Sequence, residues 1–204
     1  MQDWNAWWEK LDDHGTYYKP LFRSLASFEG EPGDDAFARI AELTEVTRYG
    51  ASSDEESLVP FDIRDLVPLE QLPRVEEVYL VACDLKSLEG IDRLPLLARV
   101  GLVRAPLEDP TPLAACPMLV ELTVTEPRYP AEALAGLTGV TKLVMAYAPW
   151  ESLAPLGALH AIEQLDCHDS GELVRIEGVQ NMPGLRTLDI SNTAVADLGP
   201  LAEA

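Results

Sequence analysis

The sequence predicts an α/β solenoid with a helical cap at its N-terminal end. Two observations carry this prediction: a regular apolar period through the last two thirds of the chain, and helical stripes without that period before it. A fixed period in this range is typical of repeats that bury their apolar faces only against their neighbours. The copies of the period, spaced by 22, 22, 21, 22 and 23 residues, start at Val75, Leu97, Leu119, Val140, Ile162 and Leu185.

Residues 1–50 predict the cap. Apolar residues spaced as one stripe of a short helix are Trp4, Trp7, Trp8 and Leu11. A second stripe runs from Tyr17 to Phe28, with Pro20 near its start, where a helix tolerates proline. After the break at Gly30–Gly33, Asp34 or Asp35 is expected to cap a third helix that contains Phe37, Ile40 and Leu43. The cap is expected to cover the open end of the solenoid, although partner docking by the tryptophans is an alternative.

The solenoid is predicted over residues 51–204, as about seven repeats of which the first is degenerate. Residues 46–49 are expected to form a short strand and residues 50–57 a polar loop. The degenerate repeat covers about 53–74, with Leu58, Ile63, Leu66, Leu69 and Leu72 at core positions.

Each full repeat changes its pattern partway. Apolar residues first alternate with period two, as in Val78-x-Leu80 and Leu188-x-Ile190, which predicts a short strand with one inward face. They then recur every third residue, as in Leu85, Leu88 and Ile91, which suits 3₁₀ or short helical turns. Recurrent prolines exclude long helices from this second part.

The charge and the cysteines limit the classes of partner and compartment. With 35 acidic and 15 basic residues, the formal net charge is −20. Such a surface argues against binding to nucleic acid or to an anionic membrane and favours a basic protein partner, although acidity can also serve solubility alone. No apolar run suggests a membrane span and the first residues do not resemble a signal peptide, so a cytoplasmic location is expected. Cys83, Cys116 and Cys167 are expected to be buried free thiols.

Residues 58–204 resemble the leucine-rich repeat family, in its short 22-residue class. That class includes bacterial internalins and a regulatory subunit of a protein phosphatase. The resemblance implies parallel strands on a concave face, turns on the convex side, and a protein that binds other proteins without doing chemistry. The family places asparagine three residues after the second strand leucine. In this chain no repeat has asparagine at that position. The residues found there are Cys83, Ala105, Pro127, Ala148, Ser170 and Thr193.

Strand alternation predicts which side chains lie on the concave face. The face mixes tyrosine, valine and arginine in its early and middle repeats, as interface hot spots do, and it becomes acidic in its late repeats. Strand propensity alone is the alternative explanation for the valines and tyrosines. The candidate protein-binding residues are Tyr79, Val81, Arg99, Val103, Arg104, Glu121, Thr123, Lys142, Val144, Tyr147, Asp166, His168, Asp169 and Asp189.

One part of this face has a chemical alternative. Asp166 and His168 lie two residues apart on one face, so a carboxylate adjoins a histidine, as in acid–base or metal sites. No nucleophile motif or phosphate loop accompanies them, so we expect an exposed polar patch, no enzyme, no cofactor and no metal.

The sequence therefore predicts a non-enzymatic adaptor that binds a protein through the concave face. One alternative is an immunity or inhibitor protein that neutralises a basic toxin or enzyme. Another is a regulatory subunit of an enzyme such as a phosphatase. The strand around Leu188 and Ile190 is expected to leave a free edge, through which the protein would self-associate or contact a partner.

Overall fold

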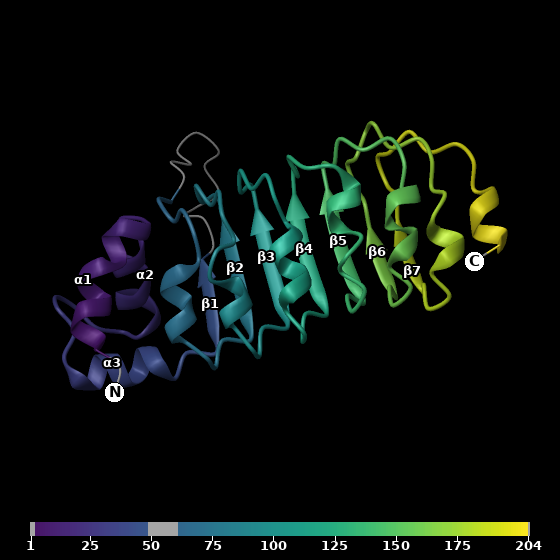
Figure 1. Cartoon of the computed structure of the whole chain (residues 1–204). Coiled ribbons are helices and arrows are strands. Elements are labelled where there is room, and N and C mark those ends of the chain that lie inside the picture. The colour runs from purple at the N-terminus through teal and green to yellow at the C-terminus, as the bar shows by residue number, and fades with distance from the viewer. Residues whose placement is uncertain (1–2, 49–60, 204) are drawn as a thin grey trace.

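A computed structural model describes residues 3–48 and 61–203 of the chain. Three short helices, α1 (Trp4–His14), α2 (Tyr18–Leu25) and α3 (Asp34–Ala41), form one end of an elongated solenoid (Figure 1). The predicted loop at residues 50–57 and the core position Leu58 lie outside the described residues. None of the described helices is long and apolar enough to cross a membrane.

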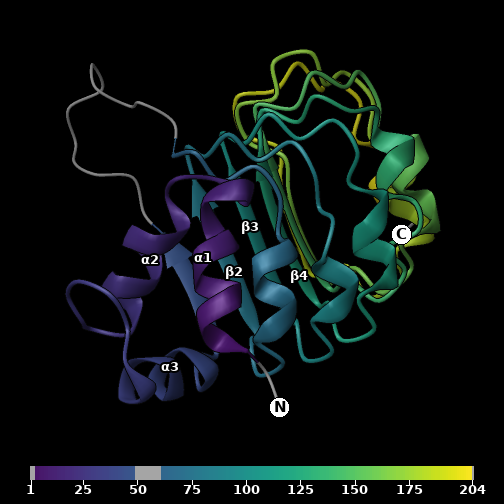
Figure 2. The same ribbon diagram turned by 60° about the vertical axis from the view of Figure 1, so that its left-hand side comes forward.

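One parallel sheet runs the length of the described solenoid, and its strands follow chain order from β1 to β7. Strands and 3₁₀ turns alternate along the chain, and the turns line up on the side opposite the sheet (Figure 2). The predicted α/β solenoid with a helical N-terminal cap is thus confirmed. The strands are β1 (Glu45–Arg48), β2 (Glu77–Val81), β3 (Arg99–Val103), β4 (Glu121–Thr125), β5 (Lys142–Ala146), β6 (Gln164–Asp166) and β7 (Thr187–Asp189). The turns are η1 (Val67–Gln71), η2 (Ile91–Arg93), η3 (Thr111–Ala115), η4 (Ala131–Leu134), η5 (Ala154–Ala158), η6 (Val179–Asn181) and η7 (Gly199–Glu203).

Strand β1 begins the sheet, because Val46 pairs with Val78 of β2 and is completely buried. The sheet therefore extends into the segment that the sequence assigns to the cap. The division of the chain at residues 50 and 51 stays a prediction.

The core is a ladder of equivalent apolar side chains, one set per repeat. Leu122 and Leu143 lie side by side on neighbouring strands and are both fully buried, as are Leu156 in η5 and Leu159 directly after it. Such stacking lets every repeat bury its apolar side against the next one. The degenerate first repeat shares this core, since Ile63, Leu66 and Leu69 are fully buried.

Two glycines explain the recurrent motif Leu88-Glu-Gly-Ile91 and Ile176-Glu-Gly-Val179. Gly90 and Gly178 have φ of +93° and +110°, a region that favours glycine. A Cβ on Gly178 would lie 2.5 Å from the carbonyl oxygen of Leu153, and one on Gly90 would lie 2.7 Å from the Cα of Val67. Each glycine thus permits close backbone contact with the preceding repeat.

The cap packs an aromatic cluster against the first turn of the solenoid. The Trp7 indole donates to the carbonyl oxygen of Pro68 at 3.1 Å, and the Tyr18 hydroxyl donates to that of Asp65 at 2.5 Å. Two details of the predicted third helix are wrong. Helix α3 ends at Ala41, so Leu43 lies beyond it, and Gly33, in extended conformation, occupies the N-cap, with Asp34 and Asp35 in the first turn. There, carboxylates still interact favourably with the helix dipole.

All three cysteines are free and buried, as expected. Burial raises the pKa of the Cys116 thiol to about 11 and that of Cys167 to about 12. Their thiolates, the reactive forms, are therefore rare at neutral pH. Ser170 occupies the repeat position where the family places asparagine, and it keeps the polar role of that position. Its hydroxyl accepts from the Ala148 amide at 3.0 Å and donates to the Met145 carbonyl oxygen at 3.3 Å.

Candidate functional site

The candidate site is the side of the sheet turned away from the core, which we call the sheet face. Strand register arranges its side chains in four rows that run across the strands, because equivalent residues lie side by side in a parallel sheet. The rows contain every candidate residue predicted from the sequence. Row one holds Arg99, Glu121 and Lys142; row two holds Tyr79, Thr123, Val144, Asp166 and Asp189; row three holds Val81, Val103 and His168; and row four holds Arg104, Tyr147 and Asp169.

Row one is a ladder of alternating charge. Arg99 Nε lies 2.6 Å from Glu77 Oε2, and Lys142 Nζ lies 3.4 Å from Glu121 Oε2. The hydrogen bond to Glu77 is the largest cause of a raised pKa of Arg99, with additional attraction from Glu121 and Glu45. These cations are therefore already neutralised within the protein, so each contributes little charge of its own to a partner.

Tyr79 lies against β3 because its neighbour there is a glycine. Tyr79 pairs with Gly101 in the register, and a Cβ on Gly101 would lie 2.1 Å from the Tyr79 ring atom Cδ2. The ring covers Gly101, which is consequently buried. With the half-buried Val81 and Val103 in row three, Tyr79 and Gly101 form an apolar area that we call the tyrosine platform.

Row four owes its geometry to a repeated backbone conformation. The residue at this position is left-handed in six successive repeats, although none of the six is glycine. Such a conformation costs a non-glycine residue about 1 kcal/mol or more, and strained positions are enriched at functional sites. The members of the row, with φ between +53° and +57°, are Ala82, Arg104, Glu126, Tyr147, Asp169 and Asn192.

Row four presents the most exposed large hydrophobic side chain among the described residues. Tyr147 is 55% exposed, and its ring meets the His168 ring edge-on at 6.3 Å. A hydrogen bond to Asp169 is the largest cause of a raised pKa of the Tyr147 hydroxyl. Asp169 also accepts from the Asn192 amide at 2.8 Å, so this carboxylate connects three repeats.

His168 lies among three carboxylates, which together form what we call the acidic corner: Asp166, Asp169 and Asp189. Its Nδ1 lies 2.6 Å from Asp166 Oδ1, and its Nε2 lies 3.9 Å from Asp169 Oδ2. The hydrogen bond to Asp166 is the largest cause of a raised His168 pKa. Asp189 accepts from Ser191, which lowers the pKa of this carboxyl. Among the described residues, no lysine or arginine forms an ion pair with the acidic corner.

The raised His168 pKa predicts a pH dependence of stability. The folded protein holds this proton more tightly than the unfolded chain, whose histidine has a pKa near 6.5. The stabilisation is therefore complete below that pH and is lost as pH rises through the folded pKa. Thermal midpoints measured across this range should fall with rising pH more steeply in the wild type than in His168→Gln. Parallel curves for the two proteins would contradict the prediction.

Alternation in the sequence predicts which residues lie on the sheet face, but three residues that shape the site were not named as candidates. Alternation places Gly101 on the sheet face without revealing that Tyr79 covers it. Glu77 and Asn192 acquire their roles only through contacts with Arg99 and Asp169 on neighbouring repeats. The described residues contain no group of three or more histidine, cysteine or acidic residues arranged to hold a metal ion.

Solved structures show which known fold this arrangement matches. Internalin C2 from Listeria monocytogenes superposes with a TM-score of 0.65 at 19% identity, over 92% of this chain and 88% of that chain. The chain has the leucine-rich repeat fold. The functional domain of InlJ from Listeria monocytogenes gives a TM-score of 0.60 at 16% identity, over 90% of this chain and 38% of that one. TLR13, solved in complex with ssRNA13, gives 0.62 at 13% identity, over 81% of this chain and 24% of that one.

No protein-family model matches the sequence, and no curated protein matches it either. The structural similarity nevertheless explains the period, since each leucine-rich repeat supplies one strand and one turn. The specific use of the sheet face has to be argued from its own residues.

Proposed function

We propose that this leucine-rich repeat is a non-enzymatic scaffold that binds a protein partner through the sheet face. The main support for this proposal is Tyr147, an aromatic side chain that is 55% exposed and held in place by Asp169. Exposed aromatic residues that are already ordered bind at low entropic cost and dominate interface energies. Tyr79 and Arg104 extend the same face toward the cap.

The solenoid supports binding by its rigidity. Backbone hydrogen bonds join neighbouring repeats, as where the Thr141 carbonyl oxygen accepts from the Glu163 amide at 2.8 Å. Seven strands at a spacing of about 4.8 Å give a sheet face on the order of 30 Å long, enough for a standard protein interface. The face needs little reorganisation on binding, so a partner would meet a preformed surface.

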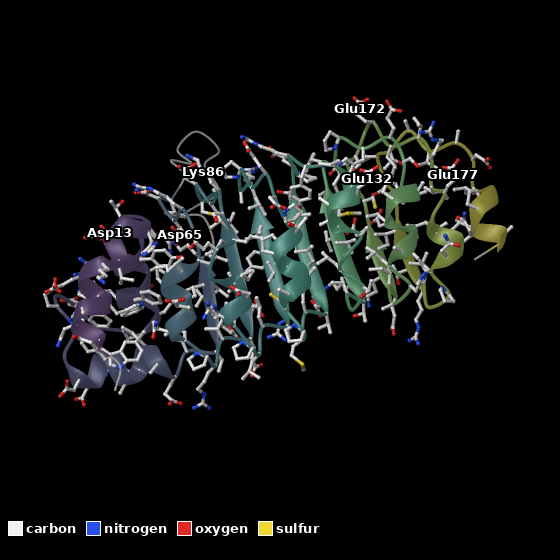
Figure 3. The ribbon with its side chains drawn as sticks, viewed as in Figure 1. Asp13, Asp65, Lys86, Glu132, Glu172 and Glu177 are labelled. Carbon is white, nitrogen blue, oxygen red and sulfur yellow. The ribbon has the colours of Figure 1, made fainter. Side chains whose placement is uncertain are left out.

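A more specific role is neutralisation of a basic protein, as an immunity or inhibitor protein does. The net charge of −20 favours it, because an acidic surface accelerates encounter with a basic partner. Acidic side chains occur along the whole molecule, as Asp13, Asp65, Glu132, Glu172 and Glu177 show in Figure 3. A regulatory subunit of an enzyme would use the same sheet face. We propose a cytoplasmic location, which the three free cysteines support.

Photocrosslinking in the native host tests the scaffold function. With a photoreactive phenylalanine analogue at Tyr147, we expect one dominant adduct, because this position would lie inside the interface. The control carries the same analogue at Glu132, which is exposed in the turn η4 on the opposite side. Equal adducts at the two positions, or adducts at Glu132 alone, would contradict binding through the sheet face.

Self-association remains a separate prediction. The outer edge of β7 pairs with no described strand, and Leu188 and Ile190 are only partly buried there. Free strand edges are sites of pairing between chains. Light scattering across a concentration series should show a mass above that of one 22.4 kDa chain, and a constant monomer mass would refute the idea.

A further inference from the structure

Charge on the sheet face is distributed unevenly along the solenoid. On β2 to β5, Arg99 pairs with Glu77 and Lys142 pairs with Glu121, so this stretch of row one is internally neutralised. At the β6 and β7 end, the three carboxylates of the acidic corner have only His168 as a charged partner in the described structure. Because like charges repel at close range, a cation placed there would gain more than one placed over row one.

The opposite part of the face is apolar and shaped for contact. On the tyrosine platform, the Tyr79 ring lies on the backbone of Gly101, next to the half-buried Val81 and Val103. An aromatic ring held flat on a sheet offers a large apolar area with little motion to lose on binding. Between platform and corner, row two holds the half-buried Thr123 and Val144.

The sheet sets the distance between these two areas. Gly101 lies on β3 and Asp166 on β6, which is three strand spacings or about 14 Å. An extended peptide advances about 3.3 Å per residue, so it would span the gap with about four residues.

We propose that the partner docks through two anchors: an apolar side chain on the tyrosine platform and a lysine or arginine in the acidic corner. This inference rests on the proposed function and adds the chemistry and spacing of the partner. The two anchors differ in physical type, so the apolar contact resists salt and the ionic one weakens with it. Protonated His168 occupies the same carboxylates, so the cationic anchor binds more tightly when this histidine is neutral.

A phage-displayed library of random linear peptides provides the probe. Selected on the wild-type protein at low salt, it should yield peptides in which a lysine or arginine lies about four residues from an aromatic or large aliphatic residue. The affinity of one selected synthetic peptide is then measured by fluorescence anisotropy for the wild type and for each variant.

Separate variants remove each anchor. The double variant Asp166→Asn with Asp189→Asn should lower the affinity for the peptide about tenfold at low salt and much less at high salt, as expected for a surface ion pair. The matched control, Glu172→Gln with Glu177→Gln, removes the same charge from exposed positions off the sheet face and should leave the affinity unchanged. Gly101→Val displaces the Tyr79 ring and should lower the affinity for the peptide about tenfold at every salt concentration. Tyr79→Ala tests the same anchor without a steric clash.

The outcomes separate the two claims. Loss of affinity in both anchor variants, with the predicted difference in salt response, supports the inference. Peptides that lose affinity at only one anchor, or that show no spacing preference, overturn it and leave sheet-face binding intact. Peptides insensitive to every sheet-face variant, Tyr147→Ala included, count against both this inference and the proposed function.

Discussion

Replacing Gly178 with alanine should destabilise the protein by about 2–5 kcal/mol, combining backbone strain with overpacking. Gly178 has φ of +110°, which alanine rarely adopts. The new Cβ would also lie 2.5 Å from the Leu153 carbonyl oxygen, a backbone atom of the preceding repeat. The Leu153 amide donates a hydrogen bond to the Arg175 carbonyl oxygen at 3.1 Å, which joins the two repeats beside the clash and opposes their separation. Urea denaturation followed by circular dichroism measures the effect.

The matched control is Gly171→Ala, in the same repeat. A Cβ on Gly171 meets nothing within 4 Å, so the urea midpoint of this variant should stay close to that of the wild type. Gly90→Ala should resemble Gly178→Ala, since its Cβ would lie 2.7 Å from the Cα of Val67. If the Gly171 and Gly178 variants unfold at the same urea concentration, close contact between repeats is not what these glycines provide.

Trp8→Ala should cost about 3–5 kcal/mol, the range for removing a large buried aromatic side chain. Only 3% of Trp8 is exposed, and its ring contacts Phe28 at 5.7 Å and Phe37 at 6.5 Å between centroids. Its indole also donates to Glu31 at 2.6 Å, and the Arg23 guanidinium lies 5.4 Å from the ring centroid. The cavity would loosen α1 from α2 and α3, and thereby the cover over β1.

Trp4→Ala is the comparison, because Trp4 is half-buried and stacks on Phe37 at 5.8 Å. Its thermal midpoint should fall clearly less than that of Trp8→Ala. Hydrogen exchange would locate the damage, and we expect faster exchange in the β1 amides than in those of β5. Equal losses for both tryptophan variants would indicate that the cap does not depend on a buried aromatic centre.

The fold was predictable because its repeats obey local rules. Alternation in Val78-x-Leu80 identified β2, and proline recurrence excluded long helices from the turns. The irregular repeats did not obscure this, since the one-residue differences in length fall between the strands and leave the strand register intact. Gly33 at the N-cap was missed because glycine competes there with two adjacent aspartates, and local sequence does not decide between them.

The site was predictable as a set of positions but not as an arrangement. Period-two alternation places Tyr79 and Asp166 on one face without further information. That Tyr79 lies flat depends on Gly101, 22 residues later, and the link between Tyr147 and Asn192 passes through Asp169. Such contacts join different repeats, and a pattern within one repeat carries no information about them.

Row four has a consequence for how binding properties can change. Its backbone is nearly the same in six repeats, while its side chains range from alanine to arginine and tyrosine. Since none of these positions requires glycine, most exchanges there alter what the surface presents and leave its shape alone. Neighbouring members such as Tyr147 and Asp169 interact across repeats, so exchanges at adjacent repeats should affect each other, whereas exchanges two or more repeats apart should act nearly independently. The scaffold and its chemical identity are therefore largely separable, and selection or design can retarget the protein a few repeats at a time.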